Sequence, residues 1–172
     1  NKMEILGHEF KTDKVTHHNY HEIYPTYIEK FYDQTGGMIE IGLEPTTGNA
    51  SLNMWLELFP NMHIYGFDKT TSNQSHERYT IFQCDQSNEN QISSFIDKIK
   101  HKIYFINDDG SHIPEHQLLT FNKLFPLLET GGVYIIEDIE TSYWTKGDLY
   151  GYKTRYGKGH SKSIIEIFKL LI

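Results

Sequence analysis

The stretch Ile103-Tyr104-Phe105-Ile106-Asn107-Asp108-Asp109-Gly110-Ser111-His112 decides which fold the sequence predicts. Its first four residues are apolar and predict a short buried strand. Pro114 follows soon after, and a proline in the first turn is typical of the start of a helix. Ligands of open α/β sheets bind beyond the carboxyl ends of the strands, so we expect Asp108, Asp109 and His112 to face a ligand crevice. The alternative is that Asp109-Gly110 only forms a turn.

A second acidic pair follows the next expected strand. Residues 131–136 predict a buried strand that paired glycines release from the preceding helix, and the strand ends in Glu137-Asp138. If the two strands are neighbours, their ends lie about 5 Å apart, and Asp109, Glu137 and Asp138 can converge on one cation. Carboxylate oxygens favour magnesium, calcium or manganese over zinc. Because consecutive strand residues point to opposite faces, Glu137 and Asp138 can share a metal only if the strand ends before them.

The composition limits the classes of protein to consider. The chain has 172 residues, of which 38% are hydrophobic, enough for one domain with its own core. A formal charge of −7 argues against general nucleic-acid binding. Cys84 is the only cysteine, so a reducing compartment is indicated. The sequence shows no signal peptide and no membrane-spanning run, so we expect a cytoplasmic protein without a membrane or nucleic-acid partner. A homo-oligomer stays open.

Strands and helices are expected to alternate along the chain. Further strands are expected over residues 38–42, 63–68 and 78–85, and helices over 25–32, 52–59 and 92–99. The alternation predicts the α/β class, with a Rossmann-like parallel sheet and flanking helices. We expect a helical lead-in over residues 1–36 that contributes to the site, and the Rossmann-like domain over residues 37–172. The last helix, which Ser163 and Glu166 begin as a capping box, has no C-cap, so we expect a truncated C-terminus.

Two strand ends in the first half of the chain are candidates for ligand binding. The turn from Gly42 to Ser51 lets a ligand approach the backbone at a helix N-terminus, although a glycine there can also be purely steric. The turn has neither a Walker lysine nor the G-x-G-x-x-G fingerprint, which disfavours phosphate. Asp68 ends the second strand, where a carboxylate can accept both hydroxyls of a ribose or can cap a loop.

Aromatic residues follow the second acidic pair. Tyr143 and Trp144 come first, and a long loop then holds Tyr150, Tyr152 and Tyr156 at the expected carboxyl edge of the sheet. Such a loop can stack on a flat or sugar-like substrate, or can pack on its own domain or a second subunit. We favour the substrate.

Four motifs together carry a resemblance to a known family. The chain resembles the class I S-adenosylmethionine-dependent methyltransferases and, more narrowly, the metal-dependent sugar O-methyltransferases of the mycinamicin and macrocin type, with their cephalosporin hydroxylase-like relatives. The resemblance covers residues 12–144. Its motifs are Thr12-Asp13-Lys14 with His18, Tyr20 and Tyr24; Asp85-Gln86-Ser87; Asp108 to His112 with His116-Gln117; and Glu137-Asp138 with Thr141-Ser142-Tyr143-Trp144.

The resemblance implies an enzyme that uses S-adenosylmethionine with Mg²⁺ or Mn²⁺ and methylates a sugar hydroxyl of a small molecule or glycan. It implies cofactor contacts at Glu40, Gly42, Ser51, Asp68, Asp85, Gln86 and Asp108. It further implies metal ligands at Asp109, Glu137 and Asp138, a general base at His112, and substrate contacts at Lys14, His18, Tyr20, Tyr143 and Trp144. The chain departs from the family in three places: the turn after Gly42 is longer, Asn107 stands where an apolar residue is usual, and the last two strands are lacking.

The residue types suit this chemistry independently of the resemblance. A divalent cation lowers the pKa of a coordinated hydroxyl, and a neutral histidine can then remove its proton. One alternative is a nicotinamide-dependent oxidoreductase, which would share Asp68 but should carry the missing glycine fingerprint. The other is a non-catalytic module with a structural metal, which has no need of His112.

Overall fold

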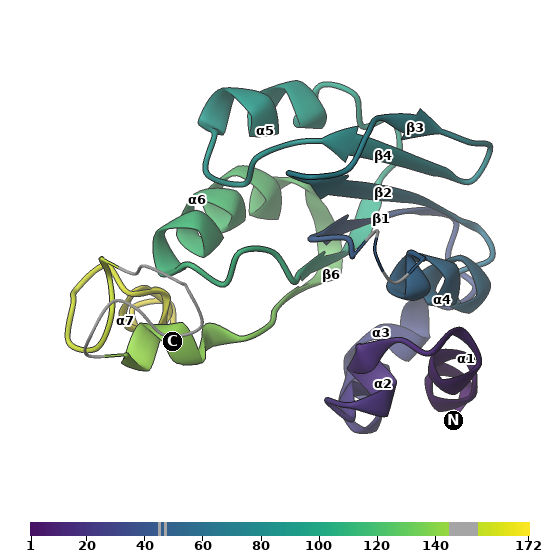
Figure 1. Ribbon diagram of the computed structural model, residues 1–172, viewed down its shortest axis with the longest axis horizontal. Helices are drawn as coiled ribbons and strands as arrows, with labels where there is room; N and C mark the ends of the chain where they lie inside the picture. Colours follow the sequence, from purple (N-terminus) through teal and green to yellow (C-terminus); the bar gives the residue numbers. More distant parts are fainter. Residues whose placement is uncertain (45, 47, 145–154) are drawn as a thin grey trace.

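The protein is described by a computed structural model that covers residues 1–44, 46, 48–144 and 155–172. Its centre is a six-stranded sheet (Figure 1). The strands are β1 (Gly36–Ile41), β2 (Met62–Asp68), β3 (Gln74–Ser75), β4 (Tyr79–Gln83), β5 (Ile103–Asp108) and β6 (Leu128–Ile136). Their order in the sheet is β3-β4-β2-β1-β5-β6, and all neighbouring pairs are parallel except β3 with β4. The α/β class and the mainly parallel sheet are therefore confirmed.

Helices precede and connect the strands. The α-helices are α1 (Lys2–Phe10), α2 (Asp13–Thr16), α3 (Tyr24–Ile28), α4 (Ala50–Leu58), α5 (Glu89–Ile96), α6 (Pro114–Leu124) and α7 (Ile164–Lys169). The 3₁₀ helices are η1 (Tyr20–Glu22), η2 (Glu29–Phe31), η4 (Phe125–Leu127) and η5 (Ile139–Tyr143). The helix expected over residues 25–32 is thus divided into α3 and η2. In the described part of the chain, no helix is both long enough and apolar enough to span a membrane.

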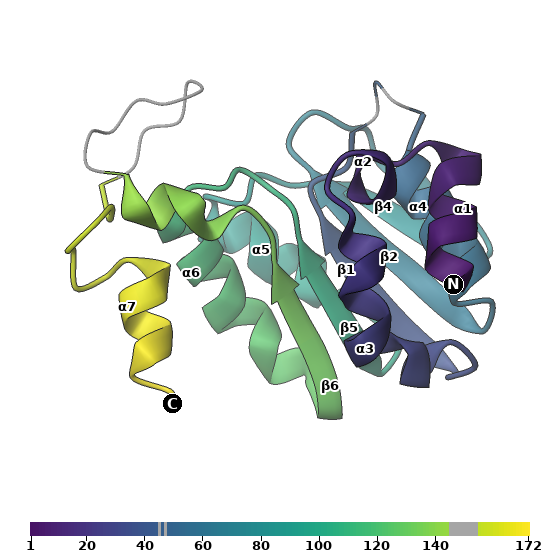
Figure 2. The same ribbon diagram turned by 90° about the horizontal axis from the view of Figure 1, so that it is seen from below.

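The sheet separates two hydrophobic cores. On one face, α5 and α6 cover a core that includes Ile39, Phe67 and Phe95 (Figure 1). On the other face, α4 and the N-terminal helices cover a core that includes Trp55 and Phe105. Figure 2 shows α3 lying across the strands on this face, with the two chain ends on opposite sides of the molecule. The central strands β1, β2 and β5 are largely buried between helices, as expected for the apolar runs of a parallel sheet.

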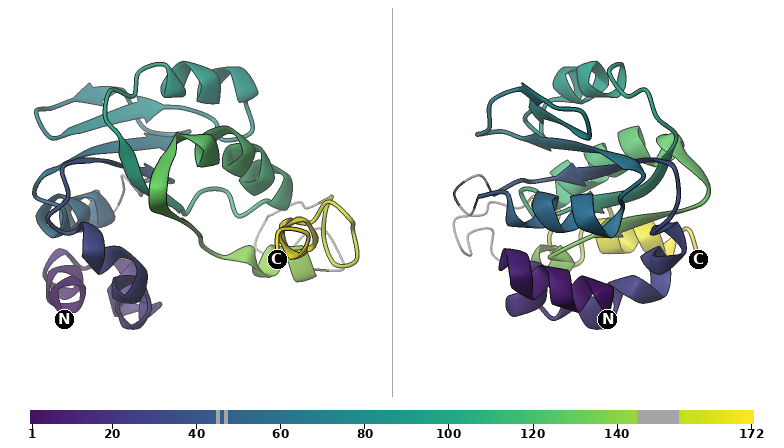
Figure 3. Two further views of the ribbon diagram at one scale, coloured as in Figure 1. Left: turned by 180° about the vertical axis from the view of Figure 1, so that it is seen from behind. Right: turned by 90° about the vertical axis from the view of Figure 1, so that its right-hand side faces the viewer.

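The N-terminal lead-in contains α1, a helix that the sequence did not delimit within the helical lead-in expected over residues 1–36. A capping box starts α1: the Asn1 side chain accepts from the Glu4 amide, and the Glu4 side chain accepts from the Asn1 backbone. Gly7 allows α1 and α2 to approach closely, since a Cβ on Gly7 would lie 2.1 Å from a methyl carbon of Val15. Figure 3 shows these helices beyond α4, on the side away from α5. The division at residues 36 and 37 stays a prediction.

The start of β6 differs from the prediction. We expected Gly131-Gly132 to release the chain from a helix, but β6 already begins at Leu128 and contains both glycines. Gly131 has a φ of +80°, and the register with β5 shifts between Ile103 and Phe105, so the glycines form an irregularity inside the strand. The error arose because paired glycines at a helix end and in a bulge look alike in sequence. Among the described residues no strand follows β6.

Candidate active site

The carboxyl ends of the parallel strands surround a cavity of about 620 Å³. Residues that follow different strands, and so come from distant parts of the sequence, line this cavity together. Twelve residues predicted for the site divide into nine that line the cavity and three that lie behind its wall. The cavity is lined by Gly42, Ser51, Asp68, Asp85, Gln86, Asp109, His112 and Asp138, together with His18. Glu40, Asp108 and Glu137 are buried behind this wall.

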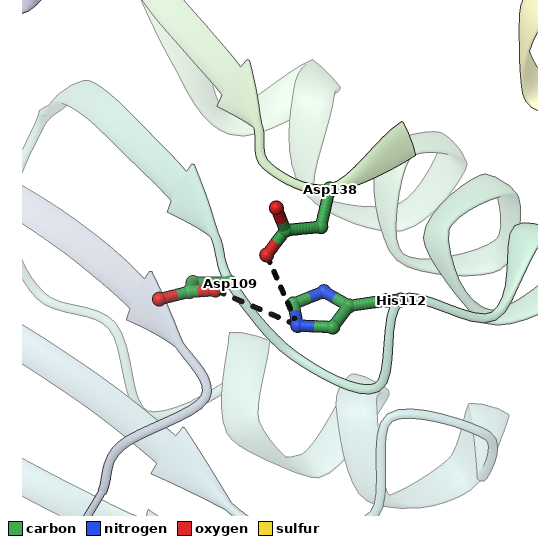
Figure 4. Close-up of side chains that lie close together, drawn as sticks. All are labelled: Asp109, His112 and Asp138. Atoms are coloured by element: carbon green, nitrogen blue, oxygen red, sulfur yellow. Dashed lines mark ion pairs between the residues drawn. The ribbon is translucent and has the colours of Figure 1, made fainter. Parts of the chain in front are cut away.

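Asp109, His112 and Asp138 all line the cavity, and their side chains point toward one another (Figure 4). Asp109 follows β5, His112 lies in the loop before α6, and Asp138 follows β6. His112 Nε2 lies 3.8 Å from Asp109 Oδ1 and 3.3 Å from Asp138 Oδ2. Because β6 ends at Ile136, Asp138 has left the strand, which meets the condition that the sequence set for a shared metal site.

The backbone around His112 is held by its neighbours. His112 has a φ of +58° and Asp138 a φ of +52°, a left-handed conformation that is uncommon for residues other than glycine. The Thr141 hydroxyl donates to the His112 carbonyl oxygen at 2.6 Å, which joins η5 to the loop before α6. Sequence reasoning gave Thr141 no role of its own, since only the fold brings it to His112.

These three side chains meet the geometric requirement for a metal site. One ligand atom from each of Asp109, His112 and Asp138 lies within 4.8 Å of the other two. The two carboxylates suit Mg²⁺ or Mn²⁺ when further oxygen ligands complete the coordination shell, whereas an imidazole is a more usual ligand of zinc, iron or copper. Glu137, which the sequence added to the ligand set, is not in this group, because its carboxylate points to a second cluster.

The second cluster is centred on Lys14. The Lys14 side chain is 1% exposed, and its Nζ lies 2.5 Å from Asp109 Oδ2 and 2.8 Å from Glu137 Oε1. Glu40 Oε1 lies 3.9 Å from the same nitrogen. Burial alone would lower the pKa of Lys14, but the carboxylates outweigh it and raise the pKa above its usual value. Lys14 was predicted to contact a substrate, whereas the structure places it among the acids behind the cavity.

Glu137 Oε1 accepts three hydrogen bonds. Besides Lys14, the donors are the Tyr24 hydroxyl and Asn107 Nδ2, the latter at 2.9 Å. Burial alone would raise the pKa of Glu137, but Lys14 and these donors hold it below its usual value, so the carboxylate is ionised. Asn107 was noted in the sequence only as a polar residue at an apolar position. Its role as a partner of Glu137 accounts for that departure.

The wall of the cavity between β1 and β4 carries the predicted cofactor residues. Asp68 accepts from the amides of Leu43 and Thr70. A hydrogen bond from Ser87 lowers the pKa of Asp85 to about 2, and the Lys69 ammonium lies 3.1 Å from its other oxygen. Lys69 had not been considered. Hydrogen bonds thus hold both carboxylates in place at the cavity wall.

Glu40 and Asp108 support this wall from behind. Ser51 Oγ donates to Glu40 Oε2 at 3.0 Å, and Gln86 Nε2 donates to both oxygens of Asp108 at 2.9 Å. Ser51 and Gln86 line the cavity, so the two buried acids act on it through them. Gly42 is essential in this wall, because a Cβ there would lie 2.0 Å from the carbonyl oxygen of Asp109.

The predicted substrate residues do not form one surface. The rings of His18, Tyr20 and Tyr24 are stacked, with centroids 5.1 and 5.2 Å apart, and this stack leads from the cavity to Glu137. Tyr143 is 56% exposed in η5 and does not line the cavity. The remaining predicted substrate residue, Trp144, follows η5. Tyr150 and Tyr152 of the aromatic loop lie outside the described residues.

No protein-family model matches the chain, but individual relatives do. The 8-demethyl-8-alpha-L-rhamnosyl tetracenomycin-C 2′-O-methyltransferase of Streptomyces olivaceus is 34% identical over 90% of this chain and 42% of its own length. The mycinamicin VI 2″-O-methyltransferase of Micromonospora griseorubida is 35% identical over 70% of this chain and 31% of its own length.

A solved structure agrees with these relatives. The MycE methyltransferase of mycinamycin biosynthesis, in complex with Mg, SAH and mycinamycin VI, has a TM-score of 0.84 and 27% identity. The match covers 99% of this chain and 47% of that chain. This chain thus spans less than half the length of each of these proteins. The resemblance seen in the sequence is confirmed: in sequence and in fold, the chain is a relative of the class I sugar O-methyltransferases of the mycinamicin type.

Proposed function

We propose that the chain carries the cofactor and metal site of an S-adenosylmethionine- and magnesium-dependent O-methyltransferase that acts on a hydroxyl of a sugar or glycosylated small molecule. The observation that carries this proposal is the meeting of Asp109, His112 and Asp138 at a cavity of about 620 Å³. The relatives support it, because they are named O-methyltransferases of glycosylated compounds, and the solved one holds Mg and SAH.

The cavity suits the cofactor in size and in polar groups. Its volume lies in the range of roughly 300–1,000 Å³ that small-molecule sites occupy. S-adenosylmethionine supplies a methyl group on a positively charged sulfur. Asp68, at the carboxyl end of β2, is placed to accept the ribose hydroxyls, and Asp85 is placed to accept from the adenine amine. We assign the methionine part to the turn at Gly42, which follows β1 and lines the cavity.

In this proposal the acids bind the metal ion and His112 removes the proton of the acceptor hydroxyl. Asp109 and Asp138 line the cavity and offer the oxygen ligands that a hard divalent cation prefers. Glu137, the third ligand of the proposal, would use its other oxygen, because Oε1 accepts from Lys14. A bound magnesium ion lowers the pKa of an acceptor hydroxyl. His112 Nε2 would accept the proton of the acceptor hydroxyl. S-adenosylmethionine, when bound, would supply the methyl group to the acceptor oxygen and keep the electron pair of the broken carbon–sulfur bond on its sulfur. Asp138, 3.3 Å from Nε2, stabilises the imidazolium that results.

A second role for His112 is favoured by one observation. The group of ligand atoms within 4.8 Å contains His112 and not Glu137, so His112 can itself be a metal ligand. The two roles predict different results for His112→Ala. A lost base removes turnover and leaves metal affinity unchanged, whereas a lost ligand weakens both.

The first experiment is isothermal titration of S-adenosylmethionine and S-adenosylhomocysteine into the chain, with Mg²⁺ and with chelator. Wild-type protein should bind both compounds. Asp68→Ala should raise the dissociation constants by about 10- to 100-fold, because a hydrogen bond to a charged group contributes roughly 1.5–3 kcal/mol. Asp97→Ala, an exposed acid that follows α5, is the matched control and should bind as wild type.

The opposite outcome has a clear meaning. If a folded wild-type chain binds neither compound, the methyltransferase proposal is wrong for this chain. Binding of Mn²⁺ without either compound would then support the alternative of a non-catalytic metal-binding module.

A further inference from the structure

Lys14 is the centre of a charge cluster to which the mechanism above gives no part. Its ammonium is 1% exposed and lies 2.5 Å from Asp109 and 2.8 Å from Glu137. The nearest oxygen of Glu40 is 3.9 Å away. Lys14 is buried and does not line the cavity described above, so we look for its function in the carboxylates that it contacts.

Lys14 divides the oxygens of Asp109 between two partners. Oδ2 lies against Lys14, and Oδ1 faces His112 at 3.8 Å. With one oxygen fixed by the ammonium, the carboxylate cannot rotate freely, and the other oxygen is presented to the side where Asp138 lies. Glu137 is fixed in the same way through Oε1, which accepts from Lys14.

The position of Lys14 is set by close helix packing. Lys14 lies in α2, and its neighbour Val15 is 1% exposed and packs against Gly7 of α1. The backbone amide of Thr12 donates to the Gly7 carbonyl oxygen, which fixes the start of α2. The N-terminal lead-in thereby places the Lys14 ammonium against Asp109 and Glu137, on the side of these acids that faces away from the cavity.

We propose that Lys14 is a positioning residue for the metal site: it orients Asp109 and Glu137 and fills the inner side of the cluster, so that a divalent cation binds only on the outer side, near Asp138. This inference rests on the proposed function, because it concerns the metal of the methyltransferase. It replaces the substrate contact that the sequence suggested for Lys14.

Two consequences follow for metal binding. Without Lys14, Asp109 and Glu137 lose their shared partner and repel each other, so the ligand geometry is lost. Removing a group that orients metal ligands costs about 10- to 100-fold in metal affinity. In a variant without Lys14, a small added cation should restore the metal affinity, whereas a neutral molecule of similar size should not.

The test is Mn²⁺ binding, measured by electron paramagnetic resonance in the presence of S-adenosylhomocysteine. Wild type should bind one Mn²⁺. Lys14→Met keeps the apolar stem and should raise the dissociation constant at least ~10-fold. Lys14→Ala should bind weakly but regain affinity with added methylammonium and not with methanol. Lys100→Met removes an exposed lysine and should leave the affinity unchanged.

A further variant covers the case in which Lys14→Met does not fold. Lys14→Met with Glu40→Gln removes the carboxylate that lies farthest from Lys14, and so restores the charge balance. The double variant should fold and still bind Mn²⁺ weakly. Folding is followed by circular dichroism, which does not depend on the metal.

The results separate this inference from the proposed function. If wild type binds Mn²⁺ and a folded Lys14 variant binds it equally well or more tightly, Lys14 does not position the ligands and the inference is wrong. Two Mn²⁺ bound to wild type would also overturn it. If wild type binds no Mn²⁺, the proposed metal dependence and this inference fail together.

Discussion

His112 and Asp138 face each other with Nε2 and Oδ2 3.3 Å apart, and both have left-handed backbones with φ values of +58° and +52°. Such a conformation costs about 1–2 kcal/mol for a residue with a side chain. Unusual backbone conformations of this kind gather at functional sites, where the surrounding fold maintains them. The proposed base, His112, and the carboxylate that stabilises its imidazolium, Asp138, thus both have a backbone conformation that their residue types seldom adopt.

Replacing His112 tests the proposed base. His112→Ala should reduce methyl transfer by about 10²- to 10⁴-fold, the usual contribution of a general base. Affinity for S-adenosylhomocysteine, measured by titration calorimetry, should not change. His76→Ala, at an exposed histidine between β3 and β4, is the control and should keep full turnover. Undiminished turnover by His112→Ala would remove His112 from the base role.

Gly42 is expected to be far more sensitive to alanine than another left-handed glycine. In Gly42→Ala the new Cβ would lie 2.0 Å from the Asp109 carbonyl oxygen, at a φ of +82°. We expect this variant to unfold at least ~2 kcal/mol more easily and to lose cofactor binding. Gly131→Ala, with a φ of +80° and no atom within 4 Å of its Cβ, should cost only about 1 kcal/mol. Urea denaturation of both variants provides the measurement; equal losses would contradict the close contact.

Gly7 tests whether the lead-in controls the site from a distance. Gly7→Ala puts a carbon 2.1 Å from a methyl group of Val15, so α2 must move away from α1. Overpacking of this kind costs about 1–3 kcal/mol in the free energy of unfolding. Since Lys14 moves with α2, Mn²⁺ affinity should fall as well. Glu9→Ala, on the exposed side of α1, should change neither quantity, and normal Mn²⁺ binding by Gly7→Ala would separate α1 from the site.

Asp108 should make the stability of the metal-free protein fall as the pH rises. Burial, with a smaller contribution from Glu137, raises the pKa of Asp108 from 3.8 to about 7. The folded state therefore keeps a proton that the unfolded state loses, and the stabilisation present below pH 3.8 is lost as the pH rises through about 7.

Asp108→Asn tests this dependence. With chelator present, wild type should lose up to ~1.4 kcal/mol per pH unit more than Asp108→Asn within this window. Asp97→Asn, at an exposed acid, should retain the wild-type slope. Parallel pH profiles for wild type and Asp108→Asn would show that Asp108 does not hold a proton in the folded state.

The sequence predicted the strands and their ends because both depend on local patterns. The apolar run before Asp109 and the proline at position 114 predicted β5 and α6 correctly. Because β5 pairs with β6, Asp109 and Asp138 lie close together, as the sequence suggested. Lys14 could not be placed in this way. Lysine is among the least buried residue types, and its burial here depends on three carboxylates that only the tertiary fold gathers.

The ion pairs of Lys14 also bear on the order in which the molecule folds. Lys14 is separated from Asp109 by 95 positions and from Glu137 by 123, so the cluster closes most of the described chain into one loop. Contacts of such long range form late, because the chain must lose the conformational entropy of the loop before the contact can stabilise it. During synthesis, Lys14 can therefore meet both partners only after the chain has been made through β6 and Glu137. Closure of the Lys14 cluster is thus expected to be a late step that marks the completion of the site.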